Sequence, residues 1–150
     1  MTDRAKTPWH LWVIGLVSLL WHAGGAYDYT MTQTHSEEYL RTAADNAGVS
    51  YETMVGYYTT FPMWADALWA FGVWGAFAGS ILLLVRSKYA FHAFVLSLIG
   101  LAGTTVFTAT SGIPAELNSS FTWIFTAVIW IVTLLLAWYA KRMTAAGVLR

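Results

Sequence analysis

The fold is decided by the stretch "PMWADALWAFGVWGAFAGSILLLVRSK", residues 62–88. It carries a single charged residue, Asp66, before it turns basic at Arg86 and Lys88. A bilayer core is about 30 Å thick, and about 20 apolar residues cross it as a helix because each residue rises 1.5 Å. The stretch therefore predicts a membrane-spanning helix over about residues 62–85, opened by a proline that a first helical turn tolerates.

Three further stretches have the same length and character, at about residues 9–27, 91–110 and 121–140. The whole chain is 57% hydrophobic and 11% charged, against about 45–50% and 25% in soluble domains. Its nine Trp, eight Tyr and eight Phe suit the level where a membrane meets water. Short connections place sequential helices side by side. We therefore expect an all-α membrane protein, in which residues 1–150 form a single domain built as an antiparallel four-helix transmembrane bundle.

The basic residues predict the orientation of this bundle. Seven of the eight flank the same side of the four spans, and only Arg41 lies elsewhere; the seven are Arg4, Lys6, Arg86, Lys88, Lys141, Arg142 and Arg150. The positive-inside rule then places both termini in the cytoplasm. The first span also has the basic start and small-residue end of a signal peptide, and we interpret it as a retained helix.

The long connection at about residues 30–61 is predicted to lie outside the membrane and to be partly helical. Residues 37–46 follow Ser36 and favour a helix, Gly48 breaks it, and residues 51–58 favour a second short helix. Loops of this length are often functional. Because the segment is rich in apolar residues, we expect it to be ordered and to lie on the membrane or over the bundle.

Small and weakly polar residues mark the helix faces that meet protein inside a membrane. They recur at steps of three and four on each predicted helix, which places them on one stripe. We interpret the glycines and threonines of these stripes as packing seams. The stripes are Gly15, Ser18, His22, Gly25 and Tyr29; Gly72, Gly75 and Gly79; Ala93, Ser97, Gly100 and Thr104; and Thr122, Thr126, Trp130, Thr133 and Ala137.

A candidate ligand site lies where "LLWHAGGAYDY", residues 19–29, leaves the first span. His22 is on the inward stripe, and Asp66 lies one turn inside the helix that re-enters, so we expect the two at comparable depth. An ionisable residue within a bilayer indicates a functional site. Carboxylates between aromatic walls suit a sugar or another polyol. The candidate ligand-binding residues are His22, Asp28, Asp66, Trp21, Tyr27, Trp64 and Trp69.

Two structural alternatives account for the same residues. Asp66 pairs with His22 or extends to the interface, and the tryptophans anchor the helices at the membrane surface. The sequence has no nucleophile elbow, phosphate-binding loop or dinucleotide motif, and its histidines and acids lack a compact metal spacing. We expect no catalytic residues, no metal, no cofactor and no enzymatic activity. A net charge of zero gives no indication of nucleic acid as a partner.

Three segments, "YDYTMTQT", "FPMWADALWAFGVWGAFAGSILLLVRSKYA" and "WYAKRMTAAGVLR", resemble a family of small bacterial four-span inner-membrane proteins often automatically labelled "sugar transporter". The resemblance covers most of the chain and carries over no catalytic residues. It implies a bacterial inner membrane, cytoplasmic termini and a periplasmic segment 30–61. The expected function is binding or transport of a small polar solute such as a sugar, by a homo-oligomer. The alternative is a non-catalytic accessory or structural subunit of a larger membrane complex.

Overall fold

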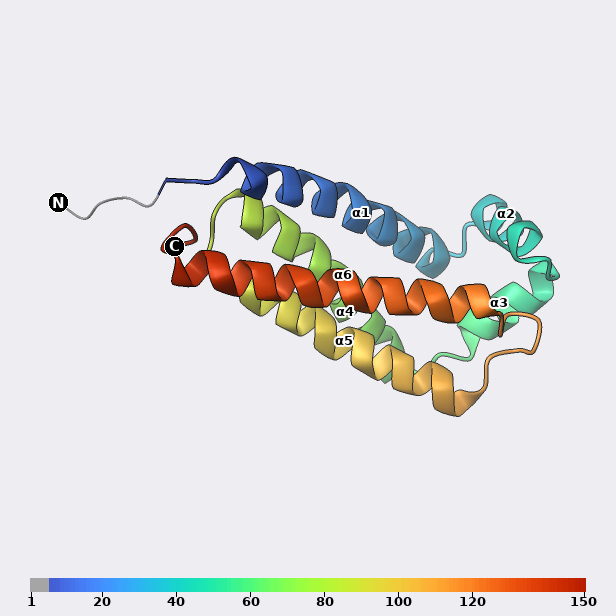
Figure 1. Cartoon of the computed structure of the whole chain (residues 1–150). Coiled ribbons are helices and arrows are strands. Elements are labelled where there is room, and N and C mark those ends of the chain that lie inside the picture. Colours follow the sequence, from blue (N-terminus) through green and yellow to red (C-terminus); the bar gives the residue numbers. More distant parts are fainter. Residues whose placement is uncertain (1–5) are drawn as a thin grey trace.

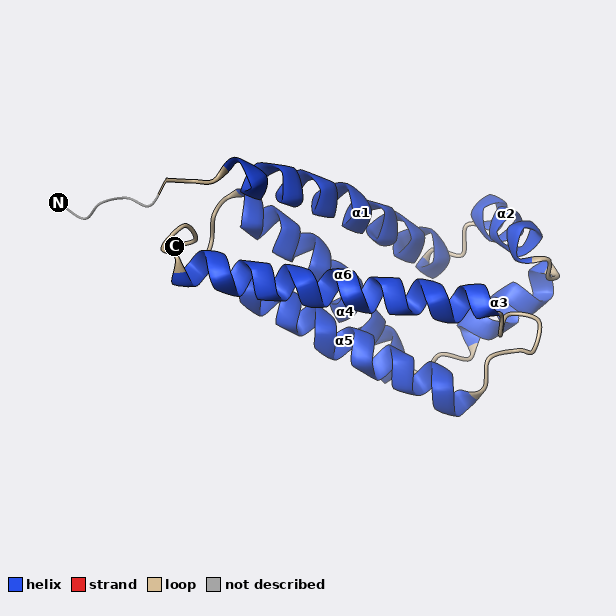
Figure 2. Ribbon diagram, viewed as in Figure 1, coloured by secondary structure: helices blue, strands red, loops and turns tan. Residues whose placement is uncertain are grey.

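The computed structural model describes residues 6–150, so Arg4 lies outside the described residues. Helices joined by loops make up this part of the chain, and it contains no strand (Figures 1 and 2). The expected all-α fold is therefore confirmed. The helices are α1 (Trp9–Gln33), α2 (Glu37–Ala47), α3 (Tyr51–Thr59), α4 (Met63–Leu84), α5 (Ala90–Ser111) and α6 (Ser120–Ala145).

The four long helices alternate in direction along the chain (Figure 1). Helix α4 packs against α1 on one side and against α5 on the other, while α6 packs mainly on α5. Helices α1 and α6 are thus the two ends of a row. Because the row bends back on itself, both helices border the same interior space.

Three of these helices, α4, α5 and α6, are long and apolar enough to cross a membrane. The spans expected at 62–85, 91–110 and 121–140 are confirmed to that extent. Helix α1 is outside this group, because two histidines and an aspartate interrupt its apolar residues. It is also longer than the expected 9–27, since no glycine or proline follows Ala26 before Gln33 to end the helix.

Glycines allow α4 and α5 to approach closely. A Cβ at Gly100 would overlap the backbone of Leu68 and Gly72, and one at Gly75 would lie 3.0 Å from the Ser97 nitrogen. Ser97 also donates a hydrogen bond to the Gly72 carbonyl across this contact. The expected packing seams of α4 and α5 are therefore confirmed at these glycines.

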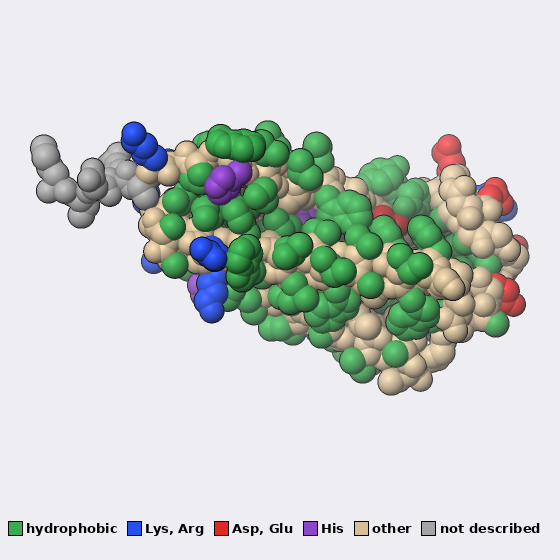
Figure 3. Space-filling model, viewed as in Figure 1, with side chains coloured by type: hydrophobic (Ala, Val, Ile, Leu, Met, Phe, Trp, Pro, Cys, Tyr) green, Lys and Arg blue, Asp and Glu red, His purple; other side chains and the backbone are tan. Residues whose placement is uncertain are grey.

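The end of the bundle where α1 begins and α6 ends is closed and basic. A buried core of nine residues fills it, among them Leu11, Phe94 and Leu136. The His10 ring nitrogen Nδ1 and the Tyr139 hydroxyl, 2.6 Å apart, join α1 to α6. Figure 3 shows Lys and Arg gathered at this end and Asp and Glu at the opposite one.

The two short helices α2 and α3 lie at the acidic end (Figure 1). Their predicted positions, 37–46 and 51–58, are confirmed within one residue. Gly48 ends α2 in the left-handed conformation, with φ at 70°, which glycine adopts without strain. Ser50 caps α3 by accepting a hydrogen bond from the Thr53 backbone, 3.1 Å away. Ser36 occupies the cap position of α2, but its side chain makes no capping bond.

Candidate functional site

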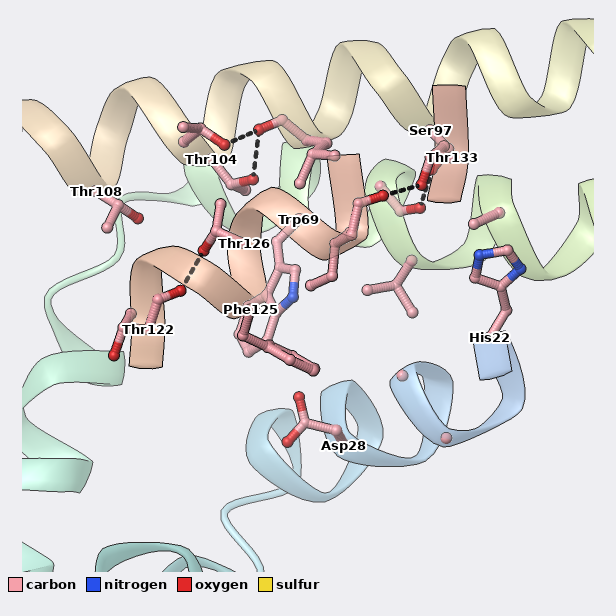
Figure 4. A pocket seen from close by; sticks show the side chains of 18 of the residues that line it. His22, Asp28, Trp69, Ser97, Thr104, Thr108, Thr122, Phe125, Thr126 and Thr133 are labelled. Atoms are coloured by element: carbon pink, nitrogen blue, oxygen red, sulfur yellow. Dashed lines mark hydrogen bonds between the residues drawn. The ribbon is translucent and has the colours of Figure 1, made fainter. Parts of the chain in front are cut away.

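A cavity of about 760 Å³ occupies the acidic half of the bundle. Side chains from α1, α3, α4, α5 and α6 line it, and Figure 4 shows it from close by. Ligand pockets for drug-sized molecules span about 300–1,000 Å³, so the cavity is large enough to bind a small organic molecule. It is the main candidate site in the described part of the chain.

One wall of the cavity is rich in hydroxyl groups from α5 and α6. Most of these hydroxyls donate to carbonyls of their own helix: Thr126 bonds the Thr122 oxygen at 2.8 Å and Thr104 bonds the Gly100 oxygen at 3.1 Å. Their lone pairs stay available as acceptors. We call this surface the hydroxyl wall; it consists of Ser97, Thr104, Thr105, Thr108, Thr122, Thr126 and Thr133.

Aromatic rings form much of the remaining lining. Tyr58 of α3 stacks on Trp69 of α4, with ring centroids 5.5 Å apart and an interplanar angle of 12°. Trp21 of α1 meets Phe125 of α6 at 6.0 Å between ring centroids. Burial raises the pKa of the Tyr58 hydroxyl, and Asp28 raises it further. Tyr58 therefore stays a neutral hydrogen-bonding group at physiological pH.

His22 lies at the inner end of the cavity, with 7% of its surface exposed. Its Nδ1 atom is 2.8 Å from the Ser80 hydroxyl, and that hydroxyl also bonds the Ala76 carbonyl. Its Nε2 atom is buried and has no hydrogen-bond partner in the described chain. Figure 4 shows the ring directed away from α1, at the end of the cavity where Ser97 and Thr133 lie.

Asp28 is the one carboxylate among the residues that line the cavity, and Figure 4 shows it directed from α1 toward the cavity. The Tyr39 hydroxyl of α2 donates a 2.6 Å hydrogen bond to it. Burial, followed by this hydrogen bond, raises the pKa of Tyr39. The contact therefore ties the outer segment to α1 next to the cavity.

The expected cluster of His22 and Asp66 does not form. Asp66 accepts a 3.3 Å hydrogen bond from the Gln33 amide and borders a separate recess of about 270 Å³. Ser80, the partner of His22, lies 14 residues after Asp66, or about 21 Å along α4. The two ionisable groups are at different depths because α1 continues to Gln33, and Gln33 is therefore the α1 residue that meets Asp66.

Of the other residues predicted from the sequence to bind a ligand, some line the cavity and some do not. Trp21, Asp28 and Trp69 line the cavity together with His22. Tyr27 is exposed and packs edge-on against Tyr39, and Trp64 is exposed and packs edge-on against Phe107. Neither of these two rings is among the residues that line the cavity.

Sequence reasoning missed the hydroxyl wall and the contribution of α3. Five members of that wall lie on the predicted inward stripes, which the sequence pattern alone assigns to packing seams. The same periodicity arises from a seam and from a cavity wall, because both exclude lipid. Tyr57, Tyr58 and Phe61 also line the cavity, and nothing in their spacing along the sequence predicts that they cover this end of the bundle.

The lining has no lysine or arginine, and residues 6–150 contain no group of three or more metal-ligating side chains. What the cavity offers is hydroxyl oxygens, one carboxylate, a histidine nitrogen and aromatic faces. These groups can bind an uncharged molecule by hydrogen bonds and stacking. Comparison of the chain with family models, curated proteins and solved structures finds no match.

Proposed function

We propose that the protein is a multi-pass membrane protein that binds a small uncharged solute bearing hydroxyl groups, of which a sugar is the type. The observation that carries this proposal is the cavity of about 760 Å³ with a hydroxyl wall, an aromatic wall and no cationic lining residue. Binding in this cavity is the first step of transport. The resemblance to bacterial inner-membrane proteins labelled as sugar transporters agrees with this assignment.

In this proposal α1 is the fourth span. It has 25 residues, or about 37 Å of helix, enough for a hydrocarbon core. Its outward face is apolar, with Val17 and Leu20 exposed by 62% and 74%. Its polar residue at mid-length, His22, faces the cavity instead of lipid. Membrane-embedded ionisable groups usually turn inward in this way.

The charge distribution favours a neutral ligand. An anion in the cavity would meet Asp28 and no lysine or arginine, and burying a charge without a partner is costly. The basic end is where the positive-inside rule places the cytoplasm. The cavity lies at the opposite, acidic end, so it is proposed to lie in the periplasmic half of the membrane.

The test is binding by the purified chain in phosphatidylcholine nanodiscs, followed by fluorescence of the tryptophans near the cavity. Glucosides and neutral polyols are compared with a sugar phosphate, and we expect saturable binding of the neutral compounds only. The double variant Thr104→Val, Thr126→Val removes two hydroxyls of the hydroxyl wall. We expect it to weaken binding about tenfold or more, because each hydrogen bond contributes about 1 kcal/mol.

Thr110→Val is the matched control, because Thr110 is an exposed threonine of α5 that bonds its own helix and does not line the cavity. Asp66→Asn is a second control, since Asp66 borders the separate recess. Unchanged binding in the double variant, or equal loss in Thr110→Val, would contradict the proposed site. Tight binding of the sugar phosphate would contradict the proposed neutrality of the ligand.

The second candidate function is that of an accessory subunit in a larger membrane complex. It is favoured by Phe71 and Trp74, which are exposed by 48% and 45% near the middle of α4 and do not line the cavity. Large rings at this depth suit contact with another protein. Copurification of one defined partner in mild detergent, lost in Phe71→Ala, Trp74→Ala, would support this function. A particle containing only this chain would contradict it.

A further inference from the structure

We propose that the ligand of the cavity is an uncharged amphiphile that enters from the bilayer through an opening between α1 and α6. This inference rests on the proposed function and narrows it, because it names the ligand class. The polar end of this ligand carries hydroxyl or carbonyl groups, and an apolar chain is attached to that end. An alkyl glycoside has this chemistry, whereas a free sugar lacks the chain.

Both ends of the cavity that face water are covered. At the basic end the buried core around Leu11, Phe94 and Leu136 fills the bundle. At the acidic end α3 lies over the bundle, where Tyr58 stacks on Trp69 and Phe61 packs against Phe107 at 4.7 Å between ring centroids. A ligand from water would therefore have to displace packed aromatic rings.

The side of the cavity between α1 and α6 is open beside the glycines of α1, next to the contact between Trp21 and Phe125. Gly24 and Gly25 line the cavity and are exposed, and a Cβ added to either would meet no atom within 4 Å. Trp21 and Phe125 border the same opening and are 40% and 45% exposed. Figure 3 views this face, and histidine and acidic atoms are visible between the apolar side chains of the two helices.

The opening faces hydrocarbon when α1 and α6 both span the membrane. Gly25 lies eight residues before the end of α1 at Gln33, or about 12 Å inside that end. Leu20, exposed by 74%, extends the apolar border. A dissolved sugar would have to cross lipid to enter here, whereas an amphiphile already resides there.

The arrangement of polar and apolar groups fits such a molecule. The hydroxyl wall is on α5 and α6, and His22, whose Nε2 atom is buried without a partner in the described chain, is at the inner end. The polar end of the ligand would bond these groups. Its chain would pass over Gly24 and Gly25, beside the contact between Trp21 and Phe125, into the surrounding lipid. An anionic headgroup would find no cation among the lining residues and would be left unpaired.

The experiment uses the full chain in phosphatidylcholine nanodiscs and a dodecyl glucoside that carries a photoreactive diazirine on its alkyl chain. We expect crosslinks at Leu20, Trp21 and Phe125, identified by mass spectrometry of the peptides. Unlabelled dodecyl glucoside should displace the probe, and methyl glucoside should compete only at a much higher concentration. Gly25→Phe adds a ring at the opening, where a Cβ meets no atom within 4 Å, and should lower the crosslink yield about tenfold.

Val17→Phe is the matched control, an exposed α1 position that does not line the cavity; its yield should equal that of the parent. Crosslinks spread evenly over the exposed helix faces and unchanged in Gly25→Phe would overturn lateral entry. Methyl glucoside competing as well as dodecyl glucoside would overturn it too, while leaving the proposed solute site in place. Absence of saturable binding for both glucosides would overturn the proposed function as well.

Discussion

His22 is the residue on which the inner end of the cavity depends. Its ring is buried, and one hydrogen bond to Ser80 joins α1 to α4. That bond fixes the orientation of the ring, and the Nε2 atom is buried without a partner in the described chain. A buried nitrogen without a partner is unfavourable, which is why we regard this position as part of a binding site.

The bond to Ser80 can be tested by Ser80→Ala, which leaves both ring nitrogens without a protein partner. We expect the free energy of unfolding to fall by about 0.6–2 kcal/mol, the range of interhelical hydrogen bonds in membranes. Reversible unfolding in mixed micelles measures it. Ser18→Ala is the control, because the Ser18 hydroxyl bonds the Gly15 carbonyl of its own helix. An equal loss in both variants would mean that the interhelical bond contributes nothing.

At the scale of the helices, α4 and α5 form the most closely packed pair of the bundle. The glycines at 72, 75 and 100 let the two backbones touch, and the Ser97 hydroxyl bonds across the contact. Helices α1 and α6 lie at the outer ends of the row and meet through side chains such as Trp21 and Phe125.

Gly100→Leu tests the role of this pair. The new side chain would overlap the backbone of Leu68 and Gly72, so α4 and α5 must separate. We expect a loss of about 1–3 kcal/mol in stability, as for overpacked cores, and weaker ligand binding because the hydroxyl wall moves with α5. Thermal unfolding in nanodiscs measures the first effect. Gly24→Leu serves as the control for stability, since a Cβ there meets no atom; equal destabilisation by both would refute the close-packing argument.

At the scale of the whole molecule, charge is segregated along the bundle axis. Lys and Arg gather at the end where α6 finishes, and Asp and Glu gather around α2 and α3. The exception is Arg41, which forms an exposed salt bridge of 2.8 Å with Glu37. By the positive-inside rule the basic end is proposed to be cytoplasmic.

The chain contains no cysteine, so single-cysteine variants report this orientation directly. Asn46→Cys is exposed on α2, and Ala146→Cys is exposed just after α6. In intact spheroplasts a membrane-impermeant maleimide should label the first and not the second, and lysis should make both reactive. The reverse pattern would invert the proposed orientation, and labelling of both before lysis would contradict an odd number of spans between the two positions.

The amino-acid sequence by itself determined where the helices lie, although α1 and α6 end later than it predicts. Long apolar runs located α4, α5 and α6, and Gly48 with its flanking residues located α2 and α3. These features are local, because helix length, caps and breakers act within a few residues. The segregation of charge also followed from sequence, since it needs only the order of the spans.

Only the tertiary structure decided which inward residues enclose a cavity and which form a packed seam. Thr126 and Gly100 are on stripes of the same kind, yet one lines open space and the other touches a backbone. The difference depends on the spacing between helices, which is set by contacts far apart in the chain. The hydrogen-bond partners of His22 and Asp66 also depend on the tertiary structure. Helix α1 continues for six residues beyond Tyr27, so Asp66 bonds Gln33, whereas His22 bonds Ser80.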